Sequence, residues 1–123
     1  MDLFNAGEFF PCHDVLEEIW SETLSEDRTF YQGLIHAAVA LFHFTEGNLG
    51  GARKMSFSAQ KYLQPYQPEH AGLAMAEFVR DFSACCRELQ FATPETLSAV
   101  TIDQTQIPHL RWLEFTRPFQ NPL

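Results

Sequence analysis

The sequence predicts an all-α protein: a compact bundle of about four main helices with an irregular C-terminal extension packed on it. Apolar residues recur at helical spacing through most of the chain, and the alternation typical of strands is nearly absent. Residues 33–44 are apolar on every side apart from two histidines, which is typical of a helix that is buried all round. Glycine and proline divide the chain into segments of helical length.

The first helical segment covers residues 5–24. Asn5 followed by Glu8 resembles an N-cap residue with its partner in the first turn. Pro11 conflicts with a continuous helix, because a proline inside a helix removes a hydrogen bond and clashes with the preceding turn. We therefore expect Pro11 to occupy the first position of a fresh helix, where its missing N–H group is not needed.

Three further helices are expected. The central one runs over residues 29–46 and ends at Gly47 and Asn48, a glycine stop signal. The next spans residues 52–63, and the prolines after it end it. The last spans residues 73–89, where an apolar seam recurs at helical spacing. The members of this seam are Met75, Val79, Phe82, Cys86 and Leu89.

The helical pattern dissolves after Phe91. Thr93 and Pro94 predict a short helical turn, and His70 and His109, which lie in proline-flanked polar loops, are expected to be exposed to solvent. Many aromatic side chains follow, and exposing them to water would be costly, so we expect this tail to lie on the bundle or on a partner subunit of a homo-oligomer. Its aromatic residues and prolines are Trp112, Phe115, Phe119, Pro108, Pro118 and Pro122.

Length and charge limit the class of protein. The 123 residues predict a single helical domain over residues 1–123. Sixteen acidic residues against eight basic ones give a net charge of −8, which argues against general binding to nucleic acids or anionic membranes. The sequence shows neither a signal peptide nor a membrane-spanning apolar run. The three cysteines, Cys12, Cys85 and Cys86, do not form a disulfide or zinc pattern, so we expect buried thiols in a cytoplasmic protein.

Polar side chains line up inside the apolar helices. Because side chains advance about 100° per residue around a helix, three side chains of the first helix share one sector, and three side chains of the central helix share another. A buried polar group without a partner costs about 1–3 kcal/mol, so we expect the two stripes to face and satisfy each other. The first stripe is His13, Glu17 and Trp20, and the second is Gln32, His36 and His43.

This arrangement predicts a cleft between the two helices that holds one divalent metal, which would be Zn, Fe or Mn. The expected ligands are His13, Glu17 and His43, with His36 as a further candidate. A metal with an open position lowers the pKa of its bound water and so generates a nucleophile for hydrolysis. The side chains expected to line the pocket around a small-molecule ligand are Trp20, Gln32, His36, Val39 and Asn48.

Other interpretations of the same residues stay open. One is a structural hydrogen-bond network in which Glu17 accepts from His13 and Trp20 reaches a carbonyl. Another is a pocket for an organic ligand. Asp14 and Glu18, the carboxylates that could move protons during hydrolysis, point away from the cleft, which weakens the hydrolase interpretation. The competing function is a non-catalytic helical binding or assembly module.

Four ordered motifs within residues 4–63 carry a resemblance. They read Phe4-Asn5-x-Gly7-x-Phe9-Phe10-x-x-His13-Asp14-x-Leu16-Glu17-x-x-Trp20, Tyr31-Gln32-Gly33-Leu34-Ile35, Ala38-Val39-Ala40-x-x-His43 and Gly47-Asn48-x-x-Gly51-Ala52. Together they resemble domain-of-unknown-function family 309, a group of small bacterial and archaeal all-helical proteins. Residues 64–123, which are helical and then irregular, carry no signature of this kind.

The resemblance implies an all-helical fold and the label of predicted metal-dependent hydrolase that members of the family often carry. It places that label on the positions of His13, Glu17 and His43. Two residues depart from the usual pattern: Asp14 stands where Glu is usual, and His36 stands where Gln is usual. A metal site common to the family therefore cannot depend on His36.

Overall fold

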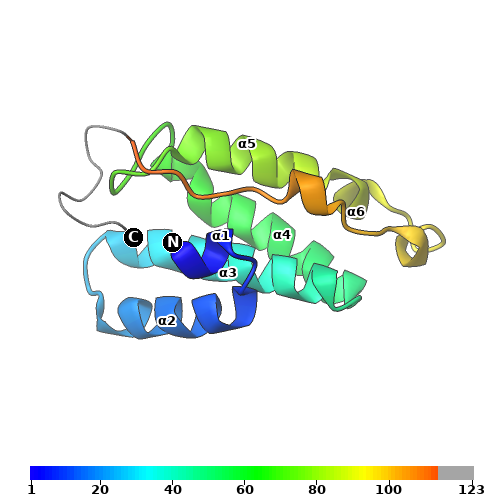
Figure 1. The fold of residues 1–123 in the computed structure, drawn as a ribbon, viewed down its shortest axis with the longest axis horizontal. Helices are drawn as coiled ribbons and strands as arrows, with labels where there is room; N and C mark the ends of the chain where they lie inside the picture. The colour runs from blue at the N-terminus through cyan, green and yellow to red at the C-terminus, as the bar shows by residue number, and fades with distance from the viewer. Residues whose placement is uncertain (114–123) are drawn as a thin grey trace.

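The structure is a computed structural model that describes residues 1–113, and it is all-α in that part of the chain (Figure 1). The four main helices expected from the sequence are confirmed as α2 to α5. The α-helices are α1 (Asp2–Asn5), α2 (Phe9–Glu22), α3 (Asp27–Thr45), α4 (Leu49–Leu63), α5 (Met75–Cys85) and α6 (Arg87–Phe91). Short 3-10 helices follow at Gln64–Tyr66, Leu97–Ala99 and Gln104–Gln106.

Helix α3 is the central element, as the sequence predicts. It packs against α2 on one side and against α4 on the other, and α5 packs against α4 (Figure 1). Because α3 has neighbours on both sides, nine of its residues are buried, whereas α2 buries only Phe9 and Cys12. Helix α2 is therefore an edge helix, with one face on the core and the rest exposed.

Helices α3 and α4 approach each other closely at Gly33. A Cβ atom placed on Gly33 would lie 2.6 Å from Cδ2 of Leu63 and 3.2 Å from Cβ of Tyr62. Leu63 is buried in a packed core, so any residue larger than glycine at this crossing would have to displace its side chain. The turn before α4 has a glycine requirement of a different kind, because Gly47 has a φ of +81°.

The start of α2 differs from the prediction. The helix begins at Phe9, so Pro11 is its third residue rather than its first. This position is still tolerated, because the N–H groups of the first turn have no partner within the helix. Asn5 is the last residue of α1 and does not cap α2, whose N-cap residue is Glu8 without a side-chain cap hydrogen bond.

The predicted helix over residues 73–89 is divided in two. Helix α5 ends at Cys85, and α6 begins after Cys86, which has φ −96° and ψ 3°. The break redirects α6 onto α4, where the amide of Gln90 donates hydrogen bonds to Oγ of Ser56 and Oε1 of Gln60, each at 3.0 Å. The apolar seam is buried on both sides of the break, at Phe82, Cys86 and Leu89.

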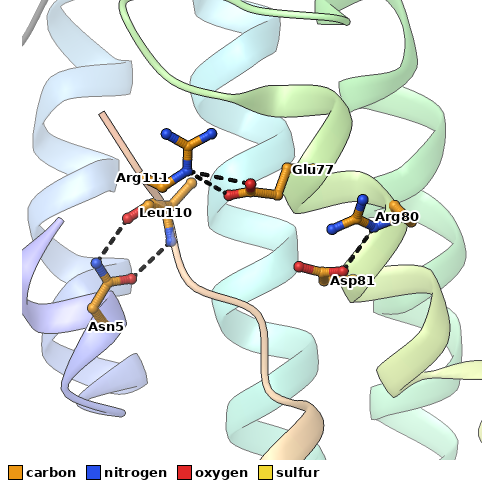
Figure 2. Close-up of polar contacts among 6 residues, drawn as sticks. All are labelled: Asn5, Glu77, Arg80, Asp81, Leu110 and Arg111. Atoms are coloured by element: carbon orange, nitrogen blue, oxygen red, sulfur yellow. Dashed lines mark hydrogen bonds and ion pairs between the residues drawn. The ribbon is translucent and has the colours of Figure 1, made fainter. Parts of the chain in front are cut away.

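A C-terminal strap, residues 107–113, lies along the helices and fastens the two ends of the described chain together (Figure 2). The Asn5 side chain donates to the carbonyl of Leu110 and accepts from its N–H group, both at 2.8 Å. Nε of Arg111 lies 2.9 Å from Oε2 of Glu77 on α5. The expectation that the tail packs on the bundle is confirmed for this segment, which includes the half-buried Trp112 and the buried Pro108. Phe115, Pro118, Phe119 and Pro122 lie outside the described residues.

In the part of the chain that the structure describes, no helix combines the length and the apolar character that crossing a membrane requires.

Candidate functional site

Helix α2 brings one imidazole and two carboxylates together on its surface. His13, Asp14 and Glu17 each offer one ligand atom, and these atoms all lie within 4.8 Å of one another. Nε2 of His13 is 3.3 Å from Oε2 of Glu17, its neighbour one helical turn later, and Nδ1 of His13 is 3.3 Å from Oδ1 of Asp14. Within residues 1–113, this is the one group of three or more His, Cys, Asp or Glu residues with metal-binding spacing.

The three side chains differ in exposure. The imidazole of His13 is 22% exposed, while the side chains of Asp14 and Glu17 are 60% and 54% exposed. The ring of His13 packs against Phe10 at 5.7 Å, and Phe10 in turn packs against Phe42 of α3 at 5.3 Å. The imidazole therefore lies against one aromatic neighbour, Phe10, and the carboxylates face water.

An open groove of about 580 Å³ lies beside this group. Its lining comes entirely from α2: Asp14, Glu17, Glu18, Trp20 and Ser21. The groove therefore runs along the outer surface of α2, and it is not the predicted cleft between α2 and α3.

The prediction that Glu17 points inward is wrong. Glu17 is exposed because α2 contacts the core with the face that carries Phe9 and Cys12, and Glu17 lies outside that face. Glu17 still meets His13, as predicted from their spacing of four residues, but the two meet at the surface.

The structure does not bring the histidines of α3 to this group. Nδ1 of His36 lies 2.5 Å from Oγ of Ser58 on α4, and its ring packs against Tyr62 at 5.2 Å. Nδ1 of His43 lies 3.3 Å from the amide nitrogen of Asn48, just before α4. His36 and His43 are two turns apart and share the face of α3 that meets α4, while Phe42 occupies the face that meets α2.

The remaining predicted pocket residues also lie apart from one another. Gln32 and Val39 are half-buried on α3, and Asn48 is the N-cap of α4, where its side-chain oxygen accepts from the N–H group of Gly51 at 3.2 Å. The ring of Trp20 is covered by the guanidinium of Arg28 at 3.9 Å. Nε1 of Trp20 is buried and meets no acceptor among the described residues, so the predicted bond to a carbonyl is absent there.

One half-buried histidine was not apparent from the sequence. His70 was expected to be exposed, but it lies 2.7 Å from Oδ1 of Asp27 and packs between Phe30 and Tyr66, at 4.6 and 4.7 Å. These contacts cross from the loop before α5 to the start of α3, and no local pattern indicates them. His109 is exposed, as expected.

The cysteines are buried free thiols, which confirms that part of the prediction. Burial raises the pKa of Cys12. Cys85 and Cys86 interact: the hydrogen bond from Cys86 lowers the pKa of the Cys85 thiol and raises that of Cys86. Cys85 also lines a cavity of about 240 Å³ beside Arg87.

His36 makes the stability of the protein depend on pH. Burial lowers the pKa of its imidazole below 6.5, because the charged form loses hydration. As the pH falls through 6.5 the unfolded chain takes up a proton that the folded chain does not, so the stability present at higher pH is lost. We expect the free energy of unfolding, measured by urea titration, to fall from about pH 7 to about pH 5.

The variant His36→Gln should weaken this dependence on pH. The variant His109→Gln, which changes an exposed histidine, is the control and should keep the slope of the original chain. An identical slope in His36→Gln would show that other groups cause the acid sensitivity.

Comparisons with known proteins match parts of the chain. Residues 1–55 match the family model described as domain of unknown function DUF309, so the predicted resemblance is confirmed over that segment. An uncharacterized protein of Aquifex aeolicus (strain VF5) is 46% identical over 46 residues, which cover 37% of this chain and 14% of the relative. The uncharacterized protein YpuF of Bacillus subtilis (strain 168) is 36% identical over 58 residues, 46% of this chain and 33% of that relative. No solved structure matches.

Proposed function

Residues 1–55 match the domain of unknown function DUF309, and from the side chains of that segment we propose that this chain binds one divalent metal ion at His13 and Glu17 on the surface of α2. The observation that supports the proposal is the convergence of His13, Asp14 and Glu17, whose ligand atoms lie within 4.8 Å of one another. An imidazole with carboxylates suits Zn²⁺, and Fe²⁺ or Mn²⁺ accept the same donors.

The three side chains have different roles in this site. Nε2 of His13 and the carboxylate of Glu17 are adjacent, at 3.3 Å, and are the metal ligands. Oδ1 of Asp14 lies 3.3 Å from Nδ1 of His13 without a hydrogen bond to it. Its negative charge favours the tautomer with the proton on Nδ1, which leaves the Nε2 lone pair free for the metal. His43, expected as a ligand, has no part in the site, because its ring lies against Asn48.

The proposed site is open, since it has two ligands from the protein and faces water. A bound metal with free coordination positions supplies an activated water, which is the chemistry of hydrolysis. The groove beside the site carries the indole of Trp20 and the carboxylate of Glu18, so it suits a small molecule that combines an apolar or aromatic part with a cationic or hydrogen-bond-donating group. Hydrolysis of such a molecule is the reaction that we propose for the site.

Zinc binding to the untagged protein, measured by isothermal titration calorimetry, tests the proposal. We expect one ion per chain, and we expect Glu17→Gln to weaken binding at least about tenfold, as ligand loss does. The matched control is Glu18→Gln, which removes the same charge one residue away and should leave the affinity unchanged. Asp14→Asn should weaken binding by about tenfold, because it removes the orienting partner of a ligand.

Circular dichroism of each variant shows whether the helices are intact. Equal zinc affinity in Glu17→Gln and Glu18→Gln, with both variants folded, would contradict the proposed site. The absence of saturable binding to the original chain would contradict it as well.

A further inference from the structure

Helix α4 presents a basic stripe to solvent. The helix contains three of the eight lysines and arginines of the chain and no acidic residue. Lys54, Phe57 and Lys61 are exposed at spacings of three and four residues, and we call these three the basic stripe. Phe57 is 48% exposed, and the guanidinium of Arg53 lies 5.7 Å from its ring. Neither lysine forms an ion pair with any described acidic residue.

Helix α2 presents the opposite charge. It contains four acidic residues and no lysine or arginine. Val15 and Ile19 are exposed, at 46% and 39%, on the flank of α2 that lies away from His13. Glu18 and Glu22 are exposed beside them, and we call these four residues the acidic stripe.

The two stripes match in length and in chemistry. Glu22 follows Val15, and Lys61 follows Lys54, by seven positions, which is about 10.5 Å of helix in each case. Each stripe has apolar side chains next to charged ones, so a contact between them would bury the apolar groups and pair the charges. The stripes cannot meet within one molecule, because α3 lies between α2 and α4 (Figure 1).

The charges also decide which surfaces can pair. A symmetric contact between two copies of α2 would oppose acidic residues to acidic residues, and a symmetric contact between two copies of α4 would oppose bases to bases. Like charges in close contact are unfavourable. A contact between α2 of one copy and α4 of another opposes unlike charges, and such a head-to-tail contact repeats from copy to copy.

We propose that this protein self-associates head to tail, through the acidic stripe of one copy and the basic stripe of the next. The contact leaves His13 and Glu17 outside, so it is independent of metal binding. At an ionic strength of about 0.1 M the Debye length is about 10 Å. Salt therefore screens the repulsion between distant charges more strongly than the attraction between closely paired charges. The net charge of −8 therefore does not prevent the contact.

Sedimentation velocity of the purified chain, with chelator present, tests the proposal. We expect the average mass to rise with concentration at about 0.1 M salt and to decrease toward that of the monomer at about 0.5 M. Two charge-reversed variants, Glu18→Lys/Glu22→Lys and Lys54→Glu/Lys61→Glu, should each be monomeric alone. In the first variant both stripes are basic, and in the second both are acidic.

Mixing the two variants in equal proportions should restore association, because the stripes of one variant then meet stripes of opposite charge on the other. The matched control, Glu69→Lys/Glu95→Lys, makes the same change in net charge as Glu18→Lys/Glu22→Lys at exposed positions outside the stripes, and it should associate like the original chain. A chain that stays monomeric at about 0.1 M salt, association that persists in either reversed variant, or a mixture that remains monomeric would each overturn the proposal.

Discussion

Phe78→Ala is expected to lower the free energy of unfolding by about 3–5 kcal/mol, the usual cost of removing a buried phenylalanine ring. The ring of Phe78 is fully buried in the main core cluster. It packs edge-on against Phe4 of α1 at 5.4 Å and stacks with Phe82 at 6.0 Å. Its loss leaves a cavity between α1 and α5 that neither helix can fill without moving.

Urea unfolding followed by circular dichroism measures this loss. The matched control is Phe91→Ala at the end of α6, where the ring is 81% exposed, and its effect should stay within about 0.5 kcal/mol. Equal destabilisation by the two variants would mean that Phe78 is not buried as described.

Gly33→Val is expected to lower the free energy of unfolding by about 2–3 kcal/mol, since overpacking a tight core has a cost of this size. A Cβ atom alone would lie 2.7 Å from Cγ of Leu63, and the two methyl groups of valine need more room. Valine is a better helix former than glycine, so a loss of stability would come from the crossing of α3 and α4 and not from helix propensity.

The same substitution at Gly50 is the control. Gly50 is also in a helix, but a Cβ atom there meets nothing within 4 Å. Gly50→Val should leave the stability unchanged or slightly raised in the same urea titration. If Gly33→Val were as stable as Gly50→Val, the close approach of α3 and α4 would be wrong.

The fold could be predicted because local patterns dominate it. Residues 33–44 indicate a buried helix from composition alone, and α3 occupies that place. The errors concern the ends and the interruptions of helices, because contacts with distant segments determine where a helix starts and stops. Asn5 forms hydrogen bonds with Leu110 instead of capping a helix. The helix is interrupted at Cys86, so that α6 reaches α4. Neither contact can be predicted from the residues next to it in the sequence.

The candidate site was predicted in part. The pairing of His13 with Glu17 follows from their spacing of four residues, which is a local property of a helix. Which side of α3 meets α2 is a tertiary property, and the alignment of His36 with His43 could not distinguish α2 from α4. Asp14 points away from α3, as expected, and its carboxylate lies at the surface 3.3 Å from the second ring nitrogen of His13.

The two hydrogen bonds between Asn5 and Leu110 join the N-terminal segment to the C-terminal strap, and this affects where the chain can be divided. The segment that matches the DUF309 model stops at residue 55, in the middle of α4, whereas Leu63 and Phe78 belong to the same core cluster as Phe4. An excised peptide of residues 1–55 would lack Leu63 and Phe78, so Phe4 and the other core residues of that segment would be exposed to water. The boundary of sequence similarity is thus not a boundary of independent folding, and the half of the chain without a family signature is what completes the fold.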